Sequence, residues 1–168
     1  MKQSIIISGQ TGTGRTRTSM VIAHEKDYDY AVVENIADLE KYIDTPTVIE
    51  FDTLSAKEFD KLPYNDKFQV VFLGFATAQP KALFEFWQGS GYQSGRNLSD
   101  DMLMVMAREI SAIGKRNKKK CDELGYKFID VADLKLHGTT SPYASQVWEY
   151  LFNEKKQVNL GTKTKFDV

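Results

Sequence analysis

The sequence is poor in the residues that build disulfides and metal clusters. One cysteine, Cys121, and two histidines, His24 and His137, occur among 168 residues. A single cysteine cannot form an intrachain disulfide, and neither histidine has the neighbours typical of a metal site or a nucleophilic triad. We therefore expect Cys121 to be a small buried side chain in a helix, and the two histidines to be structural or exposed.

Long apolar runs and a surplus of one charge are lacking as well. The first apolar run, Ile5-Ile6-Ile7, is too short for the apolar region of a signal peptide, and no run approaches membrane-spanning length. We expect a soluble cytoplasmic protein without a membrane partner. The 22 basic and 23 acidic residues give a net charge of −1, which argues against a general binder of nucleic acid, although a local basic patch is compatible with it.

What is present is an alternation of short apolar runs and helical patterns, without repeats or linkers. Strands are expected at residues 5–7, 31–33, 47–52, 69–75 and 126–131, and helices at 16–24, 36–43, 55–61, 80–87, 100–124 and from 142. This order predicts one domain over residues 1–155 and a polar C-terminal tail at 156–168. Its fold class is α/β, with three α/β/α layers around a five-stranded parallel sheet. Ligands of such sheets bind beyond the carboxyl ends of the strands, which places Gly9, Asp52 and Phe75 along one rim.

A glycine-rich loop follows the first predicted strand and opens the first predicted helix. Gly9-Gln10-Thr11-Gly12-Thr13-Gly14-Arg15-Thr16 fits the spacing of the Walker A loop, with arginine in place of lysine. Glycines let successive backbone N–H groups face one anion, and the helix N-terminus adds its positive dipole end. Thr16 would place a hydroxyl on Mg²⁺, and Arg15 would bridge the outer phosphates. The residues expected to bind the nucleotide are Gly9, Thr11, Gly12, Thr13, Gly14, Arg15 and Thr16.

Two other interpretations of this loop stay open at the level of sequence. One is an ordinary glycine-rich turn between a strand and a helix. The other is a dinucleotide-binding turn, in which Gly9, Gly12 and Gly14 make the turn and Glu34 holds a ribose. Against the second, the GxGxxG spacing is absent, because the third position counted from Gly12 and Gly14 is Arg17.

With the loop and the alternation of strands and helices, the chain resembles the P-loop kinases of nucleotides and small metabolites, such as the adenylate, gluconate and shikimate kinases. The specific match covers residues 5–19. The resemblance implies a P-loop NTPase fold with five parallel strands, ATP and Mg²⁺ as cofactors, and a lid with arginines that closes over the phosphates. It also implies that Asp52 holds Mg²⁺ through water or accepts the proton of the acceptor, with Glu50 as the second choice.

The lid's place is taken by residues of about 88–120. Arg108 and Arg116, together with Arg96, are the candidates for a clamp on the transferring phosphate. A paired-arginine lid motif is missing, and the run Lys118-Lys119-Lys120 is typical of a solvated helix face. Gly114 inside the long helix is a candidate for a bend. The aromatic residues Trp87 and Tyr92 are candidates for stacking on a base, although core packing is the more common role.

Three functions are compatible with these patterns. The first is a kinase that transfers the γ-phosphoryl group of ATP to a small-molecule acceptor. The second is a nucleotide-binding module without transfer activity, which Arg15 permits because guanidinium is planar and bulkier than ammonium. The third is a domain that hydrolyses nucleoside triphosphates and acts on DNA or with a protein partner. It would need a strand ending in Asp-Glu, whereas Asp52 is followed by Thr53.

Overall fold

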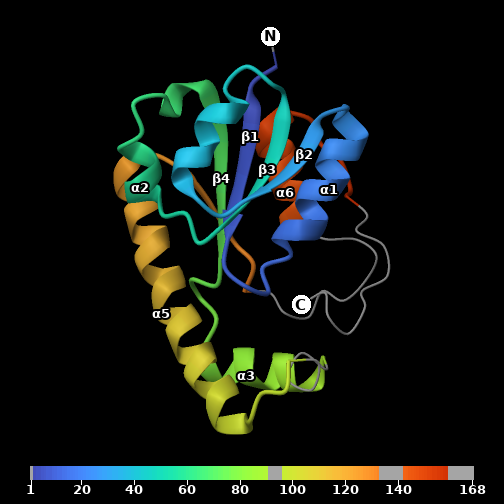
Figure 1. The fold of residues 1–168 in the computed structure, drawn as a ribbon. Coiled ribbons are helices and arrows are strands. Elements are labelled where there is room, and N and C mark those ends of the chain that lie inside the picture. The colour runs from blue at the N-terminus through green and yellow to red at the C-terminus, as the bar shows by residue number, and fades with distance from the viewer. Residues whose placement is uncertain (1, 91–95, 133–141, 159–168) are drawn as a thin grey trace.

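Strand β1 (Ser4–Gly9) lies at the centre of a five-stranded sheet in the order β2-β3-β1-β4-β5, and all of its pairings are parallel (Figure 1). The other strands are β2 (Asp29–Val33), β3 (Thr47–Asp52), β4 (Phe68–Gly74) and β5 (Lys127–Asp130). The computed structural model describes residues 2–90, 96–132 and 142–158. The predicted α/β fold with a five-stranded parallel sheet is confirmed.

Helices cover both faces of this sheet. Helices α1 (Arg15–Lys26) and α6 (Pro142–Phe152) lie on one face, and α2 (Ala56–Asp60) and the long α5 (Asp100–Leu124) lie on the other (Figure 1). Helix α3 (Pro80–Gly89) lies beyond the carboxyl ends of the strands with the N-terminal part of α5. The helix expected at 36–43 is the 3-10 helix η1 (Ile36–Tyr42), and a short 3-10 turn, η2 (Asn65–Lys67), precedes β4.

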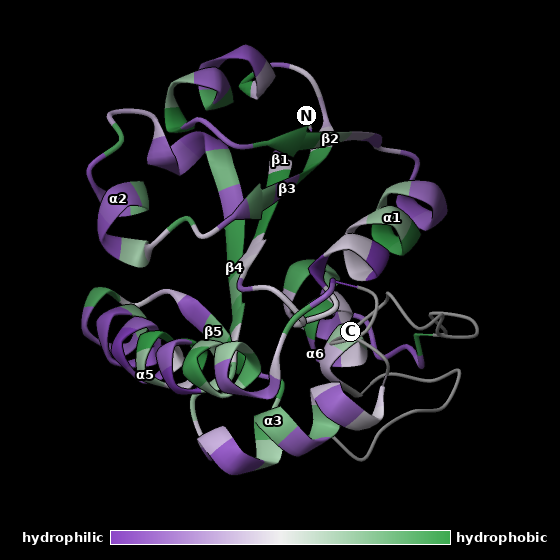
Figure 2. Ribbon diagram, turned by 60° about the horizontal axis from the view of Figure 1, so that its bottom comes forward, coloured by the Kyte–Doolittle hydropathy of each residue, from purple (hydrophilic) through white to green (hydrophobic). Residues whose placement is uncertain are grey.

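The alternation of side chains along β1 divides the core into two clusters. Ile5 and Ile7 pack with Ile22 of α1 on one face, whereas Ile6 packs with Phe59 of α2 on the other, and all five are at most 2% exposed. Central strands of a parallel sheet are buried on both faces, which is why β1 reads as an uninterrupted apolar run. Figure 2 shows the hydrophobic strands enclosed by helices that carry hydrophilic residues.

Helix α5 has the ends that its sequence predicts. The Ser99 side chain accepts a hydrogen bond from Met102 N at 3.2 Å, and Gly125 ends the helix in the left-handed region at φ 79°. Gly114 has a packing role: a Cβ there would lie 2.7 Å from the Phe75 carbonyl oxygen. The glycine lets α5 lie directly against the backbone that follows β4.

Two expectations about single side chains are settled by burial. Trp87 is fully buried and packs edge-to-face on Phe75 at a centroid distance of 6.1 Å, so it has no face for a base. Cys121 is also fully buried, and burial raises the pKa of its thiol to about 12, as expected for an inert core cysteine. Among the described helices, none combines the length and the apolar character needed to span a membrane.

The start of the expected polar tail lies against the domain. Val158 is 1% exposed, and its N–H donates to Ser145 Oγ at 2.9 Å. Lys156 forms an ion pair with Glu25 and lies over the Trp148 ring. Residues 159–168 of the expected tail, and also Tyr92 and His137, lie outside the described residues.

Candidate functional site

The glycine-rich loop connects the carboxyl end of β1 to the first turn of α1. Thr13 folds the loop back, because both its N–H, at 3.2 Å, and its Oγ1, at 2.7 Å, donate to the Gln10 carbonyl. Gly12 and Gly14 have φ angles of 85° and 74°, in the left-handed region where other residues are strained. Gly14 is the N-cap of α1 and provides no side-chain cap. The first backbone N–H groups of α1 therefore donate no hydrogen bond to a side chain of the N-cap residue.

The first turn of α6 closes one side of this loop. A Cβ atom on Gly14 would lie 2.0 Å from Tyr143 Oη and 2.8 Å from the ring carbon that bears it. The tyrosine hydroxyl thus occupies the space beside Gly14, and glycine is required there for both its φ angle and its lack of a side chain. This contact places an aromatic hydroxyl next to the N-terminus of α1.

Arg15, the first residue of α1, bridges two carboxylates at the end of β3. Its Nε donates to Glu50 Oε1 at 3.0 Å, and its Nη1 donates to Asp52 Oδ1 at 2.8 Å and also to the Gly9 carbonyl. The side chain is 14% exposed, whereas those of Glu50 and Asp52 are 6% and 50% exposed. The charge of the loop's cation is therefore compensated mainly by a buried glutamate.

Glu50 is the most connected acid of the site. Besides Arg15, it accepts hydrogen bonds from Thr16 Oγ1 at 2.7 Å and from Tyr30 Oη at 2.6 Å. Burial would raise the pKa of Glu50, but the hydrogen bonds from Tyr30, Thr16 and Arg15 outweigh it and hold this pKa below its usual range. Burial and the bond to Glu50 raise the pKa of Tyr30. Glu50 is therefore a buried, ionised carboxylate with three donors.

The structure gives the two acids different contacts, and their roles stay predictions. Asp52 was expected to act first, yet its bond within the described chain is to Arg15, whereas Glu50 contacts the threonine at the start of α1. The register is consistent with this: Asp52 ends β3 beside Gly9 of β1, whereas Glu50, two residues earlier, pairs with both Ile7 of β1 and Val32 of β2 and lies further inside the sheet. Tyr30 was missed because no motif marks it; its role depends on how β2 pairs with β3.

Comparison with known proteins adds a structural likeness. No family model matches the sequence, and no curated protein matches it. The fold is similar to that of shikimate kinase from Bacteroides thetaiotaomicron, with 12% identity, a TM-score of 0.51, and coverage of 90% of this chain and 99% of that one. An uncharacterized protein from Eubacterium ventriosum aligns over 91% of this chain and 100% of that one, at 11% identity and a TM-score of 0.49.

The chain has the P-loop NTPase fold. At such low identity, the likeness to shikimate kinase concerns the fold alone.

The P-loop fold excludes the dinucleotide-binding alternative. In that alternative the second strand is the neighbour of the first, so that an acid at its end reaches the loop. Here β3 lies between β1 and β2, and β2 is an edge strand. Glu34, which follows β2, is therefore two strands away from the loop, while the acids at the end of β3 are beside it.

The expected lid arginines are not brought to the phosphate loop in this P-loop structure. Arg108 and Arg116 are exposed on α5, whose N-terminal part lies beyond the carboxyl ends of the strands and whose C-terminal part covers the face opposite α1, and neither bonds to residues 9–16 in the described chain. Arg96 is exposed just before α5. The predicted residues that do come together are Arg15, Thr16 and Asp52, on the loop and the adjacent strand β3.

Proposed function

We propose that this chain binds ATP with Mg²⁺ at residues 9–16 and transfers the γ-phosphoryl group to a small-molecule acceptor. The observation that carries the proposal is the 2.7 Å hydrogen bond from Thr16 Oγ1 to Glu50, one residue from the guanidinium of Arg15 and beside a glycine-capped helix N-terminus. We also propose that this activity takes place in the cytoplasm.

The anion-binding half of the site would be the loop backbone. Helix α1 has 12 residues, no acid in its first turn and no side-chain cap from its N-cap residue, so neither of these competes with a phosphate for its positive end. Within the described chain, Arg15 Nη2 makes no hydrogen bond, whereas Nε and Nη1 are held by the acids and Gly9. Nη2 is therefore the guanidinium donor best placed to contact a phosphate oxygen.

The cation half would be Thr16 with the two acids. Because the Thr16 hydroxyl donates its proton to Glu50, its lone pairs are left for Mg²⁺, and Glu50 and Asp52 would hold metal-bound water. No group of three or more acids, histidines or cysteines gathers for a metal in the described chain, which suits Mg²⁺, since this ion keeps several waters and binds substrate phosphates. Bound Mg²⁺ would neutralise part of the negative charge of the phosphates.

A binding module without transfer is the second candidate, and one observation favours it. Arg15 is anchored at three points, by Glu50, Asp52 and the Gly9 carbonyl, so its charge is directed into the protein. Lysine at this position would carry a compact point charge on a flexible stem, free to follow the phosphate. The anchored arginine would support binding of the triphosphate more than its transfer.

Titration calorimetry with ATP, with and without Mg²⁺, tests the binding part. Glu50→Gln removes the charge behind Thr16, so we expect the Mg²⁺-dependent affinity to fall by about 10–100-fold, the range for groups that orient metal ligands. Glu34→Gln, at an exposed position after β2, is the matched control and should bind as the wild type does. A wild-type chain that takes up no ATP with Mg²⁺ would refute the proposal.

Formation of ADP with a panel of hydroxyl-, carboxyl- and phosphate-bearing metabolites tests the transfer part. We expect ADP to form faster when the acceptor is present, and Arg15→Lys to raise the rate. ATP binding without ADP formation by either protein would instead establish the module.

A further inference from the structure

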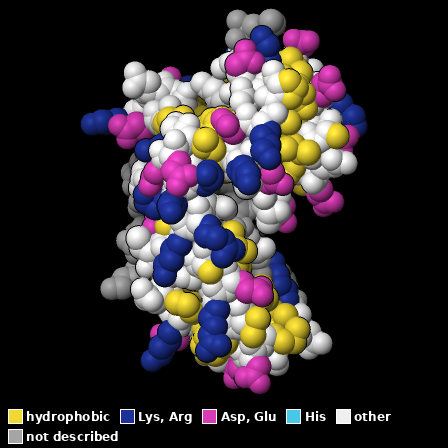
Figure 3. Space-filling model, turned by 90° about the vertical axis from the view of Figure 1, so that its left-hand side faces the viewer, with side chains coloured by type: hydrophobic (Ala, Val, Ile, Leu, Met, Phe, Trp, Pro, Cys, Tyr) yellow, Lys and Arg dark blue, Asp and Glu magenta, His cyan; other side chains and the backbone are white. Residues whose placement is uncertain are grey.

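A second concentration of charge lies on α5, on the face of the sheet opposite α1 (Figure 1). The segment from Arg108 to Lys120 holds six basic residues and one acid, Glu109, for a net charge of +5 in a chain whose total is −1. Figure 3 shows this run of basic side chains along one side of the molecule. The rest of the chain has 16 basic and 22 acidic residues, a net charge of −6, so this segment is locally positive in an acidic chain.

Three of these cations lie on one face of the helix. Arg108, Lys115 and Lys119 are spaced by seven and four residues, which at 3.6 residues per turn aligns them in a stripe about 16 Å long. We call these three residues the α5 stripe. All three are exposed, and none is in an ion pair with a described residue. By contrast, Lys118 pairs with Asp122 at 2.7 Å and Lys120 with Glu123 at 2.6 Å.

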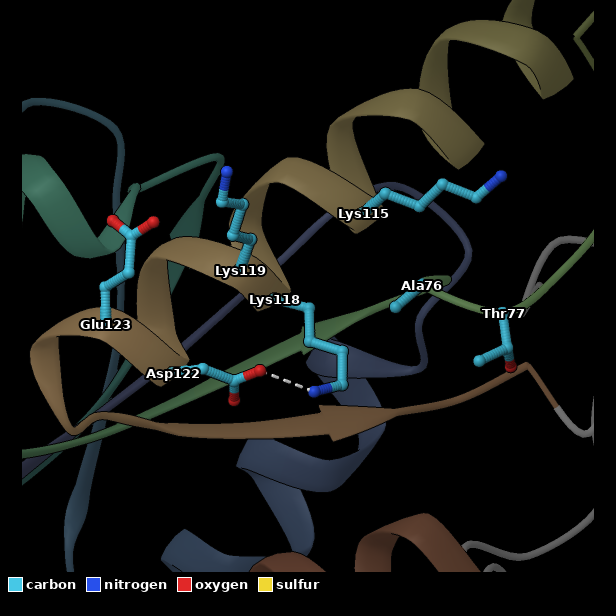
Figure 4. Close-up of a pocket in the computed structure, with 7 residues that line it drawn as sticks. All are labelled: Ala76, Thr77, Lys115, Lys118, Lys119, Asp122 and Glu123. Atoms are coloured by element: carbon cyan, nitrogen blue, oxygen red, sulfur yellow. Dashed lines mark hydrogen bonds and ion pairs between the residues drawn. The ribbon is translucent and has the colours of Figure 1, made fainter.

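The α5 stripe has no ion-pair partner among the residues that the structure describes. Lys115 and Lys119 are one turn apart, and like charges at this spacing weaken a helix. The acid nearest to Lys119, Glu123, forms its ion pair with Lys120 and interacts with Lys119 through the weaker coulombic attraction alone. Figure 4 shows Lys115 and Lys119 extending away from the bonded pair of Lys118 and Asp122. Three unpaired cations in a row therefore face solvent at a cost that an anionic partner would relieve.

A hollow of about 520 Å³ runs beside the stripe. It lies between α5 and Ala76-Thr77, the segment that follows β4, and Lys115 and Lys119 line it (Figure 4). Asp122 and Glu123 close its far end, so a negatively charged ligand is favoured only along the part lined by the stripe. The positively charged side chains of the α5 stripe thus form an elongated row, which suits a polyanion.

We propose that the α5 stripe binds the phosphate backbone of double-stranded DNA. Binding of single strands relies on exposed aromatic rings on which bases stack. Among the described residues, the exposed large hydrophobic side chains include two aromatic ones, Tyr30 and Tyr150, and neither is on α5. The α5 stripe would therefore contact only the charged phosphates. Its length matches the rise of about five base pairs along the duplex axis, at 3.4 Å each. Such contacts carry no sequence information.

Fluorescence polarisation with a labelled 20-base-pair DNA duplex tests the proposal, with the full chain in 50 to 200 mM salt. Neutralising three phosphates gives a slope of about −2.7 in log K against log salt, or about a fortyfold loss of affinity over this range. The triple variant Arg108→Glu, Lys115→Glu and Lys119→Glu should lose binding. The control Lys57→Glu, Lys61→Glu and Lys67→Glu makes the same change in net charge at exposed positions elsewhere and should bind within about twofold of the wild type.

A single variant separates binding from folding. Lys119→Glu replaces a repulsive contact with Lys115 by an attractive one, so its thermal midpoint should not fall, while the salt slope should become shallower by about one unit or more. Arg15→Ala should bind the duplex as the wild type does, which keeps this result independent of the phosphate loop.

Three outcomes would overturn the proposal. They are no salt-dependent binding of the duplex by the wild type, equal binding by the stripe and control triples, and tighter binding to single strands or anionic lipid vesicles than to the duplex.

Discussion

Tyr30 Oη donates a 2.6 Å hydrogen bond to Glu50 Oε2, and this bond joins the edge strand β2 to the acid that contacts Thr16. Glu50 is otherwise held by groups of the phosphate loop itself. The tyrosine therefore links the outer edge of the sheet to the start of α1. It acts as a positioning residue, because it contacts the acid and not the loop.

Tyr30→Phe should lower the free energy of unfolding by about 1.5–3 kcal/mol, the range for a hydrogen bond to a charged group. The low end is expected, since Tyr30 is 38% exposed and water can replace part of the bond. Urea unfolding measures the change. Tyr150→Phe, on an exposed tyrosine whose hydroxyl has no hydrogen bond in the described chain, is the control and should change stability little. Equal effects of the two variants would show that the bond to Glu50 contributes nothing.

The lowered pKa of Glu50 predicts a loss of stability in acid. Its folded-state pKa lies below the unfolded value of about 4.3, so the stabilisation is complete above that value and is lost as the pH falls through the folded pKa. Glu50→Gln should therefore unfold with a flatter dependence on pH below about 5. Urea unfolding from pH 7 to pH 3 gives both curves. Glu34→Gln should keep the wild-type slope, and an unchanged slope for Glu50→Gln would contradict the charged state of Glu50.

Most of the fold could be predicted from local patterns. Buried parallel strands are short apolar runs, and the caps at Ser99 and Gly125 mark the ends of α5 from sequence alone. The turn at Ile36–Tyr42 was less predictable, because its apolar spacing suits an α-helix while the chain forms a 3-10 helix there. The role of Gly114 could not be predicted from its own segment, because glycine is needed there to let α5 pack against the backbone of Phe75, 39 positions earlier in the chain.

The site was predictable in part, because its loop is contiguous and its other members are not. The spacing from Gly9 to Thr16 identifies the turn, and strand alternation puts Glu50 and Asp52 on one side. Which acid faces Thr16 depends on the pairing of β3 with its two neighbours. The orientation of the α5 arginines depends on how that helix packs across the sheet, which no local pattern contains.

Gly14→Ala should destabilise the protein by more than 2 kcal/mol, because an alanine there combines a strained φ angle with a clash against Tyr143. Gly125→Ala isolates the backbone contribution, since Gly125 has a φ of 79° with nothing within 4 Å, and should cost about 1–2 kcal/mol. In a Tyr143→Ala background, the cost of Gly14→Ala should fall to that level. An unchanged cost in this double-mutant cycle would show that Tyr143 does not press on the loop.

Two buried serines should respond to alanine in opposite directions. Ser19, in α1, is fully buried, and its Oγ has no hydrogen-bond partner among the described residues, so Ser19→Ala removes an unsatisfied group and improves helix propensity. We expect a gain of about 1 kcal/mol in the free energy of unfolding. Ser111, in α5, is 2% exposed and donates to the Ala78 carbonyl at 2.9 Å, so Ser111→Ala should lose about 1 kcal/mol. Denaturant unfolding of both variants decides the matter, because the two serines are equally buried and differ in their hydrogen bonding. A loss of stability in Ser19→Ala would mean that its hydroxyl has a partner after all, and the polar face of α1 would then contribute to folding as well as to the loop.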